Sequence, residues 1–234
     1  MKIIAGNFKM NKTIDECKTY VRKFSKNDMP RNRKVIICPP SYVLDIFYKA
    51  LPNVSIGAQN VGKEIDGPLT GELSASMLKS VGIDYCLIGH SERRIKLGET
   101  DLDVNAKAKL LVNQKIIPII CIGETLEEIT KKKTVLSRQL TMALDGVDGE
   151  FIIAYEPVWA IGTGKTCKLE DIEETHLYIK DKINKLFGKE VKVLYGGSVK
   201  PNNAKEILSS KLVDGVLVGG ACLDPGEFYD IILS

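Results

Sequence analysis

Eight short runs of mostly apolar residues recur along the whole chain. They are nearly continuous rather than alternating between apolar and polar positions, which is typical of parallel strands covered on both faces. We expect strands at Lys2–Gly6, Lys34–Cys38, Val54–Ala58, Tyr85–Gly89, Ile116–Ile122, Phe151–Tyr155, Val191–Tyr195 and Gly215–Val218.

The segments between these runs carry helical patterns. The clearest helix is expected at Leu169–Phe187, because its first turn is acidic, as the helix dipole favours, and Gly188 follows as a C-terminal cap. Its apolar stripe consists of Ile172, Ile179, Ile183 and Leu186, with His176 on the same face.

Two further helices have local signals. A helix is expected at Asp101–Gln114, where one side would carry Leu102, Ala106, Leu110 and Asn113. Pro201 is expected in the first turn of a helix that follows the seventh strand.

Strands that alternate with helices indicate right-handed β-α-β units. Eight such units either close into a barrel or form an open doubly wound sheet. No G-x-G-x-x-G motif follows the first strand, which weakens the dinucleotide-binding open sheet, and no Pro/Ser-rich linker divides the chain. We therefore predict an α/β fold, an eight-stranded parallel (β/α)8 barrel, as one domain over residues 1–234.

Composition narrows the function. The 234 residues carry 33 basic and 30 acidic side chains, a net charge of +3, so we expect no nucleic-acid partner, and the basic run Lys131–Lys133 is interpreted as a solvated surface. No run approaches the roughly 20 apolar residues of a membrane span, and the chain opens on a strand rather than a signal region. We expect a cytoplasmic protein that does not bind membranes.

The six cysteines are scattered, and none forms a C-x-x-C pair. This spacing predicts buried, reduced thiols rather than a metal or redox site. They are Cys17, Cys38, Cys86, Cys121, Cys167 and Cys222.

Candidate catalytic groups follow three strands, at the end where β/α barrels place their chemistry. Asn7 and Lys9 follow the first strand, His90 the fourth and Glu156 the sixth. Alone, Lys9 would be read as a surface charge and Glu156 as a salt-bridge partner. His90 is more notable, because it follows an apolar strand and a glycine and is itself followed by four polar residues.

Glycine-rich turns follow the last two strands, at Gly196–Ser198 and Gly219–Ala221. Barrels commonly bind phosphate at these positions through backbone N–H groups. The segment 160–166, with two glycines, has the composition of a mobile lid or of a plain connecting loop.

Five segments together resemble the triosephosphate isomerase family over the full length of the chain and in strand order. They are Asn7–Asn11, Ile88–Arg94, Ala154–Lys165, Tyr195–Val199 and Leu217–Ala221. The resemblance implies a TIM barrel that interconverts D-glyceraldehyde 3-phosphate and dihydroxyacetone phosphate through an enediolate, in glycolysis and gluconeogenesis, without metal or organic cofactor.

Carried over position by position, the resemblance implies that Glu156 is the general base, His90 the neutral electrophile and Lys9 the cation that stabilises the enediolate, with Asn7 as a polar neighbour. It implies Glu92 as a second carboxylate beside the lysine. The implied phosphate contacts are Gly162, Ser198, Gly219 and Gly220, and the implied lid covers residues 157–167.

The resemblance also implies a homodimer, in which the loop 59–73 docks into the partner with Thr70 near the partner's active site. Three features depart from the family's pattern: Phe8 replaces a common tryptophan, the segment 125–150 is short, and Cys167 ends the lid. They bear on the outer helices and the lid rather than on a catalytic role.

Two other functions compete with the isomerase. Another phosphate-binding barrel enzyme, such as an aldolase or synthase, would share the glycine turns but would use a Schiff-base lysine or other groups. A non-catalytic barrel would be expected to lack at least one of Lys9, His90 and Glu156.

Overall fold

The computed structural model describes residues 1–160 and 167–234, and within them eight parallel strands close into a barrel. The strands follow one another in chain order, and β1 pairs with both β2 and β8. Each expected strand is present with bounds that differ by at most one residue. The bounds are β1 Lys2–Asn7, β2 Arg33–Cys38, β3 Ser55–Ala58, β4 Tyr85–Ile88, β5 Ile117–Ile122, β6 Ile152–Tyr155, β7 Lys192–Tyr195 and β8 Gly215–Val218.

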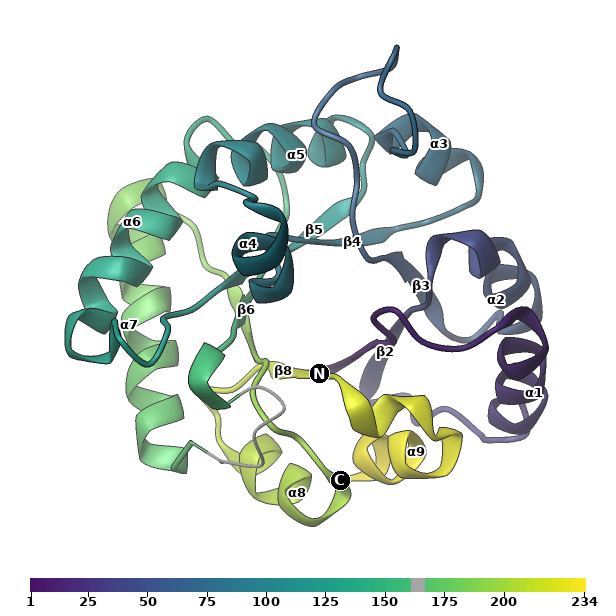
Figure 1. Cartoon of the computed structure of the whole chain (residues 1–234). Coiled ribbons are helices and arrows are strands. Elements are labelled where there is room, and N and C mark those ends of the chain that lie inside the picture. Colours follow the sequence, from purple (N-terminus) through teal and green to yellow (C-terminus); the bar gives the residue numbers. More distant parts are fainter. Residues whose placement is uncertain (161–166) are drawn as a thin grey trace.

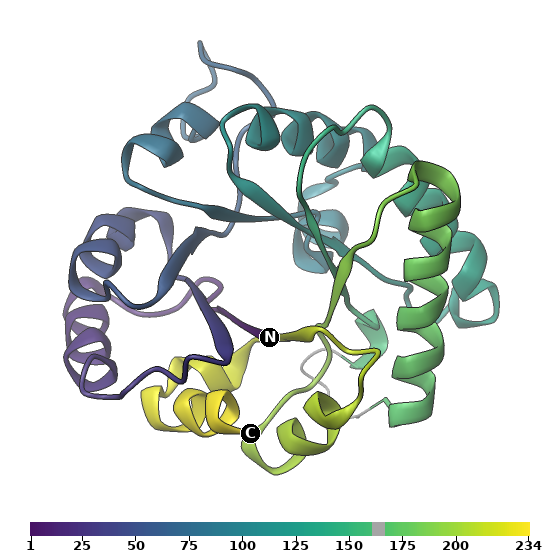
Figure 2. The ribbon, with the colours of Figure 1, turned by 180° about the vertical axis from the view of Figure 1, so that it is seen from behind.

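The helices form a ring outside the strands, except for α4, which lies inside this ring at one end of the barrel (Figures 1 and 2). This confirms the predicted (β/α)8 barrel. The helices are α1 Ile14–Phe24, α2 Leu44–Ala50, α3 Ala75–Ser80, α4 Ser91–Leu97, α5 Asp101–Asn113, α6 Lys132–Leu144, α7 Leu169–Phe187, α8 Pro201–Ser209 and α9 Pro225–Leu233.

Two layers of buried side chains follow from the alternation of residues along each strand. One set fills the barrel interior, and the other packs between the strands and the helices. The interior set consists of Ile3, Ala5, Ile36, Cys38, Leu87, Ile119, Cys121, Ile152, Ala154, Leu194 and Leu217. The barrel is therefore a packed core, and a ligand can reach only its ends.

Local signals place several helix ends where the sequence predicts them. Helix α7 has the predicted bounds and ends at Gly188 in the left-handed conformation, with φ of 63°. Pro201 is the first residue of α8. None of the described helices is long and apolar enough to cross a membrane.

The side of α5 that carries Leu102, Ala106, Leu110 and Asn113 is not its buried side. Leu102 is 67% exposed, whereas Val104, Ala108 and Leu111 are fully buried. The inward face also includes charged Lys107, whose ammonium pairs with the buried carboxylate of Glu99. The pattern of apolar residues in the sequence does not identify this face, because it also buries the charged residues Asp101 and Lys107 in ion pairs.

His176 lies on the buried face of α7, as predicted, and its imidazole is fully buried. Its Nδ1 is 3.4 Å from the carbonyl oxygen of Leu212, and Nε2 has no hydrogen-bond partner among the described residues. Burial lowers the pKa of His176 to about 4. The ring is therefore neutral in the folded protein at pH 7.

This burial predicts a loss of stability in mild acid. The unfolded chain takes up a proton on His176 near pH 6.5, whereas the folded chain does so only near pH 4. The contribution of the neutral ring is thus complete above pH 6.5 and falls between pH 6.5 and 4, by about 1.4 kcal/mol per pH unit. Urea unfolding at pH 7 and 5 should show a smaller decrease in His176→Leu than in the wild type. Equal decreases would contradict the prediction.

Candidate active site

A cavity of about 390 Å3 opens at the carboxyl ends of the strands. The described residues that the sequence nominates for catalysis and substrate binding all line it. They are Asn7, Lys9, His90, Glu156, Ser198, Gly219 and Gly220. Gly162 lies outside the described residues. The fold thus brings together side chains from β1, β4 and β6 with the turns after β7 and β8.

Lys9 is held in an unusual backbone conformation, with φ of 53°. A left-handed conformation is unfavourable for a residue with a Cβ, so neighbouring bonds must hold it. The Lys9 N–H donates to Asn7 Oδ1 at 2.9 Å, and Gln59 Nε2 donates to the Lys9 carbonyl at 2.9 Å. These two bonds hold the Lys9 backbone in place, so that its side chain extends into the cavity.

The Lys9 ammonium is paired with Glu92, the carboxylate that the resemblance places beside it. Lys9 Nζ lies 2.7 Å from Glu92 Oε1. Burial favours the neutral form of Glu92, but the hydrogen bond and charge of Lys9 outweigh it and hold the pKa of Glu92 below its usual value. Glu92 is therefore a carboxylate at neutral pH.

The hydrogen bonds of His90 define its tautomer. His90 caps the N-terminus of α4, where the backbone N–H of Glu92 donates to Nδ1 at 3.2 Å. An accepting Nδ1 carries no proton, so the neutral ring carries its proton on Nε2. That Nε2 lies 3.1 Å from Glu156 Oε1 and lines the cavity. A neutral imidazole N–H can therefore be presented to a ligand there.

Glu156 is a buried carboxylate, 2% exposed, at the exit of β6. Its Oε2 accepts a hydrogen bond of 3.1 Å from the Ser91 N–H. Two glycines leave room for it: a Cβ at Gly123 would lie 1.7 Å from the Glu156 carbonyl oxygen, and one at Gly196 would lie 2.9 Å from its Cγ. Larger residues at these positions would displace the carboxylate.

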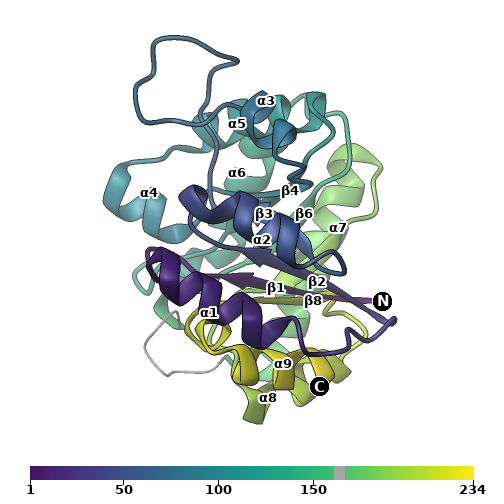
Figure 3. The ribbon, with the colours of Figure 1, turned by 90° about the vertical axis from the view of Figure 1, so that its right-hand side faces the viewer.

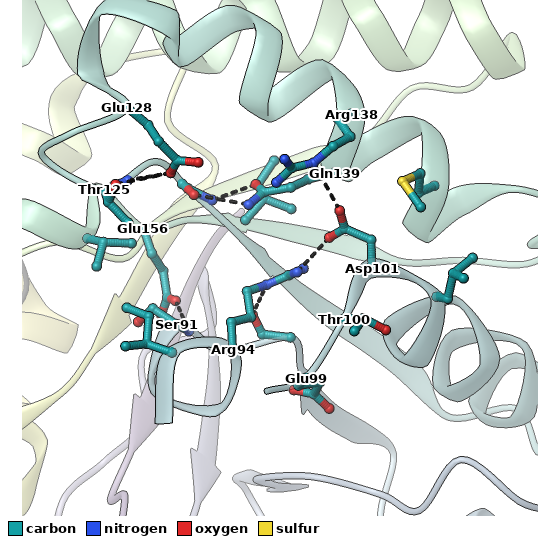
Figure 4. A pocket seen from close by; sticks show the side chains of 17 residues that line it. Ser91, Arg94, Glu99, Thr100, Asp101, Thr125, Glu128, Arg138, Gln139 and Glu156 are labelled. Atoms are coloured by element: carbon teal, nitrogen blue, oxygen red, sulfur yellow. Dashed lines mark hydrogen bonds and ion pairs between the residues drawn. The ribbon is translucent and has the colours of Figure 1, made fainter. Parts of the chain in front are cut away.

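A second cavity, of about 470 Å3, lies between α4, α5 and α6, and Glu156 lines this one as well (Figure 4). The carboxylate thus lies between the two cavities, with Ser91 beside it. The polar side chains of the second cavity are mostly paired with one another: Arg94 and Arg138 both contact Asp101.

The turn after β7 is ordered by a side chain from α8. Asn203 Nδ2 donates to the Ser198 carbonyl at 3.0 Å, and Asn203 Oδ1 accepts from the Lys200 N–H at 2.8 Å. After β8, the short 3-10 helix Gly220–Leu223 begins at the cavity. Both turns supply backbone N–H groups, which are suited to an anion.

Of the expected lid, residues 161–166 lie outside the described residues. The part directly after β6 is anchored by Glu124, which is 1% exposed. Its Oε1 accepts from Tyr155 Oη at 3.1 Å and from Trp159 Nε1 at 3.0 Å, while Val158 N–H donates to the Glu124 carbonyl at 3.0 Å. The backbone next to Glu156 is thereby fixed.

Cys121 is fully buried in the barrel interior below Glu156. Burial, assisted by the nearby charge of Glu156, raises the pKa of the Cys121 thiol well above its usual value. A neutral buried thiol is a poor nucleophile, so its contribution is packing.

Cys121→Ala should therefore cost stability rather than catalysis. The lost contacts should lower the free energy of unfolding by about 1–2 kcal/mol, a decrease in Tm of roughly 2–8 °C for a chain of this size. Thermal unfolding and kcat measured on one preparation check this. An activity loss above about tenfold, or 1.4 kcal/mol of barrier, with unchanged Tm would assign Cys121 to the chemistry.

A closed (β/α)8 barrel with a carboxylate, an imidazole and an ammonium at one mouth defines a β/α-barrel enzyme. The family model described as triosephosphate isomerase matches residues 2–234, and the chain belongs to this family. The triosephosphate isomerase of Alkaliphilus oremlandii is 45% identical, covering 98% of both chains. That of Aquifex aeolicus is 43% identical, covering 100% of this chain and 99% of its own.

Several residues around the site escape a reading of the sequence alone. Gln59 holds Lys9, Glu124 holds the backbone after Glu156, and the Ser91 N–H holds the carboxylate. Each acts across elements that are distant in sequence. Only the clustering of polar residues after β4 could have drawn attention to Ser91.

Proposed function

We propose that this chain interconverts D-glyceraldehyde 3-phosphate and dihydroxyacetone phosphate. The observation that carries the proposal is the meeting of Glu156, the Nε2 of a neutral His90 and the Lys9 ammonium at one cavity, beside two turns rich in backbone N–H groups.

In the proposed reaction, the Glu156 carboxylate removes the proton from the carbon next to the substrate carbonyl. The C–H electron pair forms the C=C bond of an enediolate, and the carbonyl π electrons move onto oxygen. The protonated Glu156 then returns the proton to the neighbouring carbon, which completes the isomerisation. For this step Glu156 Oε2 must exchange the Ser91 N–H for the substrate.

His90 and Lys9 would stabilise the negative oxygen that forms in this reaction. The Nε2–H of His90 donates to it and moves protons between the two substrate oxygens, and the Lys9 ammonium supplies charge. The substrate phosphate would be bound by the backbone at Ser198, Gly219 and Gly220, together with Gly162. Asn7 holds the lysine backbone. The roles are assigned by family resemblance and supported by the distances above.

The direct test is a coupled assay of D-glyceraldehyde 3-phosphate conversion by the purified protein. Turnover that is insensitive to borohydride would support the isomerase. A folded protein without turnover, or one trapped by borohydride with substrate, would instead favour another sugar-phosphate enzyme. We further propose that the chain is a single catalytic domain acting in glycolysis and gluconeogenesis in the cytoplasm.

We also propose that the active form is a homodimer. The loop between β3 and α3, residues 59–74, projects beyond the ring of helices (Figures 1 and 3). It presents Ile65, 72% exposed, and Leu69, 39% exposed, and Met10 beside the cavity is 97% exposed. Apolar side chains this exposed are suited to burial against a second copy.

Light scattering at micromolar concentration should therefore give the mass of two chains. Ile65→Asp should shift the mass toward one chain and lower kcat, because a buried unpaired charge opposes association. Ile14→Asp, at the exposed start of α1, is a surface control. A wild type with the mass of one chain would reject the dimer.

A further inference from the structure

The side chain of Arg94 folds back from α4 toward the carboxyl ends of β4 and β5 (Figure 4). Its Nε donates to the Gly89 carbonyl at 2.7 Å, and its Nη2 donates to the Cys121 carbonyl at 3.3 Å. Its Nη1 lies 2.5 Å from Asp101 Oδ1 at the start of α5. One guanidinium thus joins the exit of β4, the end of β5 and the first turn of α5.

The backbone is shaped to admit this guanidinium. Gly89 has φ of 69°, and a Cβ there would lie 2.9 Å from Arg94 Nη2 and 3.1 Å from the Cys121 carbonyl oxygen. The β4–β5 pairing ends at Ile88 and Ile120, one residue before these two carbonyls. Beyond the last paired residues of β4 and β5, Arg94 links the two strands by donating to the next carbonyl of each.

The carbonyl that Arg94 holds belongs to the residue directly before His90. The same first turn of α4 contains the Ser91 N–H that binds Glu156 Oε2 and the Glu92 N–H that fixes the His90 tautomer. The orientation of the Gly89 peptide therefore sets the orientation of the His90 side chain and of the Ser91 and Glu92 N–H groups. Through this peptide Arg94 is connected to the 3.1 Å approach of His90 Nε2 to Glu156 Oε1.

We propose that Arg94 is a positioning residue for the isomerisation: by binding the carbonyls of Gly89 and Cys121, it sets His90 and Ser91 against Glu156. The inference rests on the proposed function of the site. Arg94 lines the second cavity but not the first, so it acts through His90 rather than on substrate.

The geometry requires arginine in particular. The planar guanidinium fork carries five N–H donors in fixed directions, whereas a lysine ammonium is a point charge that cannot reach two separate carbonyls and a carboxylate at once. Asp101 holds the fork in place and is itself contacted by Arg138 Nε at 3.3 Å. Arg138 touches neither strand carbonyl, which makes it the matched control.

The experiment compares Arg94→Lys, Arg94→Ala and Arg138→Ala with the wild type in the isomerase assay. For both Arg94 variants we expect kcat to fall by about tenfold or more, since small misplacements of catalytic groups cost about this much, while KM changes little. Arg138→Ala should keep its kcat. Circular dichroism and thermal unfolding would establish that each protein is folded at the assay temperature. If Arg94→Ala does not fold, Arg94→Lys decides.

Two readouts separate positioning from general destabilisation. Added guanidinium at tens of millimolar can enter through the second cavity and should raise kcat of Arg94→Ala, but not of Arg94→Lys, whereas sodium chloride should have no such effect. The ¹⁵N resonances of the His90 ring should shift in both Arg94 variants and stay fixed in Arg138→Ala.

Folded Arg94 variants with wild-type kcat, or a lost kcat with an unchanged His90 spectrum, would overturn the inference. A wild type without isomerase activity would reject the proposed function instead. In that case the His90 spectra alone would still support or refute the positioning by Arg94.

Discussion

Replacing Glu156 by glutamine is expected to lower kcat by about 10²–10⁴, the range that a positioned general base contributes. Glutamine keeps the size of the side chain and an oxygen that can accept from the Ser91 N–H. It removes the basic oxygen that would take the proton from carbon. The amide nitrogen takes the place of Oε1, which lies 3.1 Å from His90 Nε2, so the change removes the basic oxygen and the acceptor for this imidazole N–H, while it keeps the packing of a position that is only 2% exposed.

The matched control is Glu128→Gln, because Glu128 also lines the second cavity (Figure 4) and accepts from Thr125 without reaching the first cavity. It should retain wild-type kcat. Exchange of the substrate C–H proton with deuterium from D₂O should disappear in Glu156→Gln in step with kcat. A folded Glu156→Gln protein that keeps full activity would remove Glu156 from the role of base.

Lys9→Met should lower kcat/KM by about 10²–10³, comparable to the loss of one donor to a developing oxyanion. Methionine retains most of the side-chain length but no charge. It leaves Glu92 without its partner, so an uncompensated carboxylate would face the place where negative charge forms. Both effects oppose the enediolate.

Lys12→Met provides the comparison within the same loop. Lys12 also has a positive φ, of 74°, but its ammonium lies over the Tyr20 ring at 5.7 Å, and it does not line the cavity. The activity of Lys12→Met should remain within about threefold of the wild type, because Lys12 does not contact the reacting atoms. Equal losses in the two variants would point to the loop backbone rather than to the Lys9 charge.

The strand pattern was sufficient to predict where the candidate groups lie. Buried parallel strands are apolar on both faces, so the first polar residue after each run marks a strand exit, and His90 and Glu156 stand at such exits. Because all eight exits of a barrel meet at one mouth, these residues had to converge. The assignment of base and electrophile came from family resemblance.

What the sequence could not supply are contacts between distant elements. The left-handed backbone of Lys9 depends on Gln59, 50 residues further along the chain. Asp101 is buried because two arginines from α4 and α6 reach it. Neither pairing leaves a periodic signal, since each involves single side chains from separate helices.

The pairing of β1 with β8 has a consequence for the order in which this chain folds during synthesis. One edge of β1 pairs with β8, residues 215–218, and Arg33 Nη2 of β2 donates to the carbonyl of Ser234 after α9. A nascent chain therefore carries an open strand edge on β1, the kind of surface that promotes association with other chains, until β8 has been synthesised and can pair with it. The barrel can close only after β8 has been made, although β1 was made long before it.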